Sequence, residues 1–349
     1  MAEFLDSFDN RGSADATARY TIAVTSSSVT ISITSAAGRN GTNGLRLARN
    51  QFVASGVAVD LLRSMPGANR YKIAFARAWS TLPPSGQYRA IATMRDSGIT
   101  QCELRLYGDG TLRLYRSGTL VTGGQSTFTV TAGTRYHFEW DLTVHNTTGA
   151  SELRINDSIT AFTVVNQNTR VTANNTINEV GIRFIPSDSG DTSFNDDIDD
   201  LIIHDSASFV GDCRVDYKPP DGNGTYAAWT ANGAASLYQC VDETSHNGDT
   251  DYASSATVNQ KQTFTHGDIP VTATVKFVQQ VWVAKKTDAG TRTFAPRIKS
   301  GGSEQLGTNI APGTGYAFYE QSTNLDPATG VTWTASGLNA AEFGEEVTS

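Results

Sequence analysis

The chain has 349 residues with a formal net charge of −8, and 18% of its residues are charged, below the roughly 25% that is typical of soluble domains. An acidic chain without a basic run offers little to a phosphate backbone, so we expect no nucleic-acid partner. No segment approaches the ~20 continuous apolar residues of a membrane-spanning helix, so membrane insertion is not expected either. A 38% share of hydrophobic residues is enough for a packed core.

Period-two alternation of apolar and polar residues predicts β-strands through the first part of the chain. From Tyr136 to Val144 the even positions are apolar and the odd positions polar, which predicts a strand with one buried and one solvated face. Two alternating runs flank Gly108–Gly110, which predicts a β-hairpin. Weaker alternation predicts further strands at residues 29–33, 70–78, 161–165, 180–184 and 201–203.

The composition changes near residue 208. Residues 219–224 begin with two prolines and read as a loop, because proline cannot donate to a central strand. We expect strands at 271–284, 291–298 and 316–319, the first buried on both faces. A short terminal helix is expected within residues 335–347. The prediction is an all-β protein with two β-sandwich domains, a jelly roll at 1–207 and a second sandwich at 208–349.

An acidic run near the end of the first domain is a candidate calcium site. Asp196, Asp197, Asp199 and Asp200 place four carboxylates in five residues. Calcium prefers six to eight oxygen ligands, and Asp188, Ser189 and Asp191 lie just upstream. Strand alternation, however, sends the four carboxylates to two faces. A solvated acidic strand is the alternative, so calcium is a possible ligand and no cofactor is required.

No catalytic residue is predicted. Glycoside hydrolysis needs two suitably spaced carboxyl groups, and Glu139-Trp140-Asp141 lacks the further glutamate of the jelly-roll glucanase pattern. There is no Gly-x-Ser-x-Gly sequence, and the five histidines lack metal-ligand spacing. Cys102, Cys213 and Cys240 form neither a disulfide framework nor a zinc pattern.

Two tryptophans are candidate sugar-binding residues. Sugar sites use aromatic faces on loops. Trp79 precedes the loop at residues 83–84, and Trp229 follows the one at 219–224. Both side chains could instead be core anchors.

Two groups of motifs resemble known families. The first comprises Tyr136–Trp140, Ser151–Asp157 and Phe194–Asp205, and it resembles the laminin-G-like, concanavalin-A-like jelly roll. The second is similar to the carboxyl half of a family of tailed-bacteriophage virion proteins that carry such a jelly roll in front. Its motifs lie at residues 211–216, 229, 241–243, 249–252, 285–292 and 326–334.

The resemblance implies a structural virion component displayed on the particle surface, such as a minor tail or tail-fibre protein, or a capsid decoration. Such a protein acts by binding and assembly and is not an enzyme. Its expected partners are other virion proteins and further copies of itself, and its expected location is the virion, assembled in the host bacterial cytoplasm. The alternative is a carbohydrate-binding adsorption module that recognises host-surface glycans, and a polysaccharide depolymerase ranks third.

Overall fold

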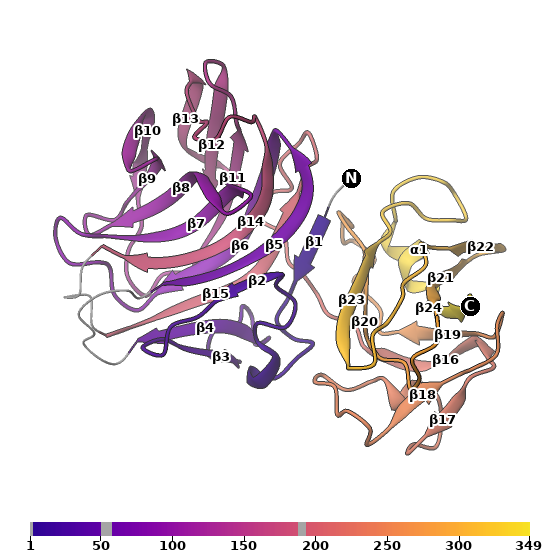
Figure 1. Ribbon diagram of the computed structural model, residues 1–349. Helices are drawn as coiled ribbons and strands as arrows, with labels where there is room; N and C mark the ends of the chain where they lie inside the picture. Colours follow the sequence, from indigo (N-terminus) through magenta and orange to yellow (C-terminus); the bar gives the residue numbers. More distant parts are fainter. Residues whose placement is uncertain (1–2, 50–57, 188–192) are drawn as a thin grey trace. The chain divides into compact units, whose positions relative to one another are not determined.

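The computed structural model describes residues 3–49, 58–187 and 193–349 (Figure 1). The chain forms two compact units, Met1–Val215 and Asp216–Ser349. Nearly all the regular structure is antiparallel β, which confirms the predicted all-β, sandwich-type fold. None of the helices in the described ranges is long and apolar enough to cross a membrane.

The first unit contains two antiparallel sheets. The eight-stranded sheet has the order β13-β12-β11-β6-β15-β4-β3, with β1 also paired to β15, and the seven-stranded sheet has the order β10-β9-β8-β7-β14-β5-β2. The strands of the eight-stranded sheet are β1 (Glu3–Asp6), β3 (Thr30–Thr34), β4 (Gly44–Arg49), β6 (Arg70–Trp79), β11 (Tyr136–Thr143), β12 (Gly149–Ile155), β13 (Ile159–Gln167) and β15 (Phe194–His204). Those of the seven-stranded sheet are β2 (Ile22–Val24), β5 (Val59–Ala68), β7 (Tyr88–Asp96), β8 (Ile99–Tyr107), β9 (Thr111–Arg116), β10 (Thr119–Thr129) and β14 (Ile177–Pro186).

The core of this unit lies between the two sheets. Phe75, Trp79 and Phe138 from the eight-stranded sheet and Leu104 and Leu112 from the seven-stranded sheet are fully buried in one cluster. Each large apolar side chain contributes about 1.5–3 kcal/mol on burial. Because both inner faces supply the core, the two outer faces point in opposite directions and are chemically independent.

The predicted hairpin is present. Strands β8 and β9 pair with Leu104 opposite Leu114, and Gly108–Gly110 connect them. Gly110 has a φ of +79°, and a Cβ there would lie 2.5 Å from the Val130 carbonyl oxygen. Only glycine fits both conditions, so this turn sets the register of the hairpin.

The second unit has a five-stranded sheet in the order β16-β19-β24-β21-β22 and two strand pairs, β17 with β18 and β20 with β23. The strands of the five-stranded sheet are β16 (Pro220–Ala227), β19 (Lys261–His266), β21 (Phe294–Ser300), β22 (Ser303–Leu306) and β24 (Glu342–Val347). The other elements of the unit are β17 (Thr230–Asn232), β18 (Tyr252–Ser254), β20 (Gln279–Ala284), β23 (Ala317–Ser322), α1 (Ala335–Asn339) and η2 (Tyr238–Cys240), and η1 (Ser13–Asp15) belongs to the first unit.

Three local predictions for the second unit need correction. The stretch read as a loop at 219–224 begins strand β16, which tolerates Pro220 because it lies at a sheet edge. The terminal helix ends at Asn339, and Glu342–Val347 form a strand instead. Only the second half of residues 271–284 is a strand, and Val271 is 78% exposed.

Candidate functional site

The outer face of the seven-stranded sheet carries a compact group of aromatic residues. Tyr88 on β7, Tyr107 on β8 and Tyr115 on β9 form what we call the tyrosine stack, on three adjacent strands (Figure 1). Their ring centroids are 5.4 Å (Tyr88–Tyr107), 6.1 Å (Tyr107–Tyr115) and 6.4 Å (Tyr88–Tyr115) apart. The hydroxyl oxygens of Tyr107 and Tyr115 are 2.6 Å apart, so one donates a hydrogen bond to the other. All three side chains are partly exposed.

Two guanidinium groups lie on the faces of these rings. The Arg105 guanidinium carbon is 4.1 Å from the ring centroid of Tyr88 and 3.9 Å from that of Tyr115, so it lies between the two rings. The Arg113 carbon is 3.8 Å from the Tyr107 centroid. Each such cation–π contact is worth about 0.5–2 kcal/mol. Together they fix the two arginines before any ligand arrives.

Carboxylates hold the far edges of both guanidinium groups. Arg105 Nε donates to Glu103 Oε1 at 2.7 Å, and Arg113 Nη2 donates to Asp109 Oδ2 at 2.7 Å. Arg105 also makes a side-chain hydrogen bond with Tyr107, whereas Nη1 of Arg113 has no hydrogen-bond partner among the residues that the structure describes. The Nη1 group of Arg113, with the phenol hydroxyls, is therefore available to a ligand.

An ion-pair ladder extends from the stack across the sheet. Glu103 Oε2 lies 2.8 Å from Arg183 Nη1, and Arg183 Nε lies 2.8 Å from Asp60 Oδ1. Arg95 continues the ladder, 3.3 Å from Asp60 and 3.1 Å from Glu179. Each carboxylate of the ladder is therefore engaged in an ion pair with at least one arginine.

Burial raises the pKa of Tyr107 to about 12, and the hydrogen bond with Tyr115 acts in the same direction. The Tyr107 phenol is therefore protonated at neutral pH. Such a phenol can donate a proton, and the hydroxyl hydrogen-bonded to it can pass on a proton in turn.

The structure corrects one predicted sugar-binding residue and leaves the other as a prediction. Trp79 is fully buried in the first core, with its ring centroid 5.7 Å from that of Phe138, so it offers no face to a sugar. Trp229 is partly exposed in the second unit. Its indole Nε1 donates to the Gln260 carbonyl oxygen at 3.1 Å.

The acidic run does not form one ligand cage. Asp196 is buried and paired with Arg77 in the core, whereas Asp197 pairs with Arg46 on the outer face. Asp199 accepts a hydrogen bond from the backbone N–H of Arg39 at 2.6 Å. Asp200 accepts one from the backbone N–H of Val215 at 2.9 Å.

The described ranges contain no group of three or more His, Cys, Asp or Glu side chains that could hold a metal ion. Strand alternation and these separate partners explain why the four carboxylates do not converge. Asp188, Ser189 and Asp191, the expected additional ligands, lie outside the described residues.

Glu139 and Asp141 are structural groups on the outer face of the eight-stranded sheet. Glu139 accepts hydrogen bonds from the backbone N–H groups of Val210 (2.7 Å) and Gly211 (3.0 Å). Asp141 pairs with Arg70 at 2.5 Å. The expected solvated face of β11 is thus largely buried, because the segment after β15 folds over it.

Sequence reasoning missed the tyrosine stack, although a signal was present. The leucines alone predict the hairpin. The intervening positions are Arg105, Tyr107, Arg113 and Tyr115. Alternation puts these four side chains on one face of two paired strands, where long aromatic and cationic groups reach one another.

The chain is similar to known proteins at the level of solved structures. No protein-family model matches the sequence, and no curated protein matches it. Among solved structures, the cellulose-induced protein Cip1 has 17% identity over 54% of this chain and 89% of its own, with a TM-score of 0.41. A glucuronan lyase from the fungus Trichoderma reesei has 12% identity over 56% of this chain and 95% of its own, with a TM-score of 0.40. A GH131 β-glucanase catalytic domain from Podospora anserina has 15% identity over 59% of this chain and 97% of its own, with a TM-score of 0.36.

These comparisons overturn two expectations, namely that the chain is a structural virion component and that it is not an enzyme. The similar structures are mostly polysaccharide lyases and glucanases, and none of those named is a phage virion protein. At such identities the likeness concerns the fold alone, so the function has to be argued from the side chains of this chain.

Proposed function

We propose that this protein is carbohydrate-active and cleaves an acidic polysaccharide at the tyrosine stack. The observation that carries the proposal is the Tyr107–Tyr115 hydroxyl pair, 2.6 Å apart, with Arg105 and Arg113 fixed against the same rings. Phenol and guanidinium groups match the hydroxyl and carboxylate groups of a uronic-acid chain. A neutral polysaccharide would leave the available Nη1 group of Arg113 without a charged partner.

The face favours elimination over hydrolysis. Two-carboxyl hydrolysis needs two carboxyl groups that both reach the glycosidic bond, whereas Asp60, Glu103, Asp109 and Glu179 are each engaged in an ion pair with arginine. Elimination uses a cation to stabilise the charge that develops at the uronate carboxylate. It also needs a proton to move from C5 to the glycosidic oxygen, which two phenols in hydrogen-bond contact can relay.

In the proposed step, the Tyr107–Tyr115 pair gives up and regains the same number of protons. The Tyr107 hydroxyl gives its proton to the glycosidic oxygen as the bond from C4 to that oxygen breaks. Tyr115 passes its proton to Tyr107 and takes the proton from C5, and the electron pair of that C–H bond forms the C4=C5 double bond. Both tyrosines end as they began, and no oxidant or cofactor enters the reaction.

The test is incubation of the full chain with alginate, polygalacturonate and glucuronan, with a neutral β-glucan as the control polymer. The readout is the ultraviolet absorbance of the new double bond. We expect absorbance to rise with at least one acidic polymer, and we expect the double variant Y107F/Y115F to lose about 100-fold or more in rate. The matched variant Y226F removes a hydroxyl from the second unit and should keep full activity.

Two results would contradict the proposal. One is cleavage of the neutral polymer with no unsaturated product, which would indicate hydrolysis. The other is an unchanged rate in Y107F/Y115F, which would place the chemistry elsewhere in the molecule.

A further inference from the structure

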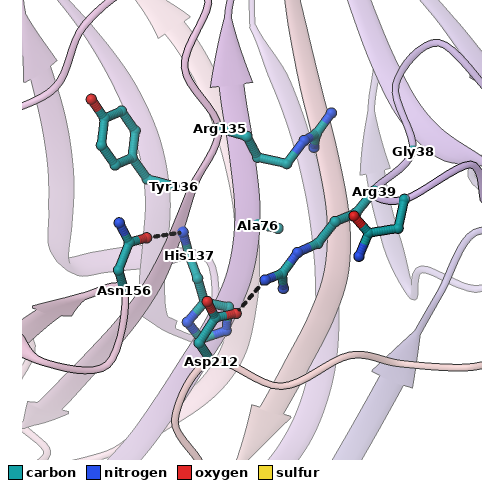
Figure 2. Close-up of a pocket in the computed structure, with 9 residues that line it drawn as sticks. Gly38, Arg39, Ala76, Arg135, Tyr136, His137, Asn156 and Asp212 are labelled. Atoms are coloured by element: carbon teal, nitrogen blue, oxygen red, sulfur yellow. Dashed lines mark hydrogen bonds and ion pairs between the residues drawn. The ribbon is translucent and has the colours of Figure 1, made fainter.

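A second site lies on the opposite side of the first unit. A pocket of about 470 Å³ opens on the outer face of the eight-stranded sheet (Figure 2), within the size range of small-molecule sites. Its walls are the turn at residues 38–40 between β3 and β4, the segment 135–137 that opens β11, Asn156 after β12, and Asp212 from the segment after β15. The small side chain of Ala76, on β6, also lines it.

Two buried nitrogen atoms of the lining residues have no hydrogen-bond partner in the described part of the chain. They are His137 Nε2 and Arg135 Nη1. His137 is only 3% exposed, and its backbone N–H is already bonded to Asn156 Oδ1 at 3.0 Å. Buried polar atoms in native proteins are almost always paired. Two unpaired donors or acceptors at one pocket therefore indicate a group that this chain does not itself supply.

The charges around the pocket define that group. Arg39 is neutralised, because its Nη2 lies 2.7 Å from Asp212 and its Nη1 lies 3.3 Å from Asp200. Arg135 donates through Nη2 to the Ala37 carbonyl oxygen at 2.7 Å, and no carboxylate pairs with it in the described part of the chain. The lining thus has one uncompensated positive charge. A planar guanidinium group matches a carboxylate best.

The other lining groups suit hydroxyls. Among the described residues, no hydrogen bond or ion pair engages the second oxygen of Asp212, Oδ2, and the Asp212 side chain is 33% exposed. Burial lowers the pKa of His137, so the imidazole is neutral at neutral pH and offers both a donor and an acceptor. Such a mixed lining recognises several hydroxyl groups around a single negative charge.

We propose that this pocket binds a small polyhydroxylated carboxylate about the size of one uronate, with the carboxylate on Arg135 and a hydroxyl on His137. The site is separate from the tyrosine stack and does not depend on the cleavage proposed there. It requires no metal ion and no second chain.

The experiment titrates the full chain with glucuronate as the probe. Binding is measured by titration calorimetry and by the shift of the imidazole resonances of His137. We expect saturable binding, a shift of the His137 signals, and a loss of about tenfold or more in affinity in R135Q. The variant R292Q removes an exposed arginine from the second unit and should bind as the unchanged chain does. The Y107F/Y115F variant should also bind normally, which separates this proposal from the proposed function.

Glucose and inorganic phosphate are the two control ligands. We expect glucose to bind much more weakly because it has no charge, and phosphate more weakly because it lacks the hydroxyls. The proposal is overturned if glucuronate neither binds nor shifts the His137 signals, or if R135Q keeps the full affinity. Phosphate binding as tightly as glucuronate would also overturn it, since the pocket would then be a general oxyanion site. Because the His137 signals are read on the unchanged chain, the test remains decisive even if R135Q fails to fold.

Discussion

Single carboxylates in the run Asp196–Asp200 have very different energetic roles. Asp196 is fully buried against Arg77, with Arg77 Nε donating to Asp196 Oδ1 at 2.7 Å. Asp197 makes a similar pair with Arg46, but both side chains are partly exposed, at 15% and 24%. Removing one partner of a buried pair leaves an uncompensated charge, whereas an exposed pair is worth little.

The prediction is that D196N lowers the free energy of unfolding by about 3–5 kcal/mol, and that D197N lowers it by about 0–1 kcal/mol. Urea denaturation of the two variants measures both values. Equal losses would show that burial does not separate these neighbouring residues.

Glu345 makes the second unit sensitive to pH. Its carboxylate is buried and accepts hydrogen bonds from Gln262 Nε2 and Trp282 Nε1. Burial is the largest cause of a pKa raised from 4.5 to about 7. Between these values the folded state binds the proton that the unfolded state has released. The contribution of Glu345 to stability therefore falls as the pH rises through this window.

We expect E345Q to remove that dependence and to be more stable than the unchanged chain above pH ~7, by an amount on the order of 3 kcal/mol. Within residues 3–49, 58–187 and 193–349 the Gln262 Oε1 atom has no hydrogen-bond partner, so the Gln262 amide can turn over and accept a hydrogen bond from the new amide. Thermal unfolding followed from pH ~4 to ~8 checks this. A variant that is less stable than the unchanged chain at the alkaline end contradicts it.

At the scale of elements, alternation predicted strands well and their solvent exposure poorly. The β8–β9 hairpin followed from Gly108–Gly110 and the flanking leucines, because turn and strand signals are local. The outer face of β11 was expected to be solvated, yet His137 and Glu139 are 3% and 2% exposed. Their cover is a stretch without regular structure that follows β15, and no periodicity reveals where such a stretch will lie.

Glu139 holds that covering stretch in place, so E139Q should loosen it. One of its two bonds to the N–H groups of Val210 and Gly211 would be lost, because the amide has a single acceptor oxygen. We expect hydrogen exchange at these two amides to quicken by about tenfold, which corresponds to about 1.4 kcal/mol. Polysaccharide cleavage should be unchanged because the tyrosine stack lies on the opposite outer face. Loss of cleavage in E139Q would contradict the structural role of Glu139 and indicate a catalytic one.

At the scale of the whole molecule, all residues of both proposed sites lie in the first unit, Met1–Val215. A chain ending after Val215 should therefore keep cleavage and glucuronate binding. A chain ending after residue 207, at the boundary expected from composition, loses the backbone partners of Glu139 and Asp200 as well as Asp212. We expect the shorter chain to unfold at a lower temperature and to lose glucuronate binding. Equal melting temperatures would contradict this.

The fold class could be predicted from the sequence, whereas the function could not. Short alternating strands are enough to indicate a sandwich, but a jelly roll serves many functions and the deciding side chains meet only in three dimensions. The resemblance to tailed-phage virion proteins, the location in a virion, and the assembly with other virion proteins or with copies of itself stay predictions. Purified particles that contain this chain would support them.

The most direct test of the central claim is a titration of the full chain, isotope-labelled at its tyrosine rings, with an acidic oligosaccharide. Binding at the tyrosine stack predicts that the ring signals of Tyr88, Tyr107 and Tyr115 shift together, while those of Tyr226 and Tyr319 in the second unit stay in place. Shifts confined to other tyrosines, or none at saturating oligosaccharide, would contradict the assignment of the site.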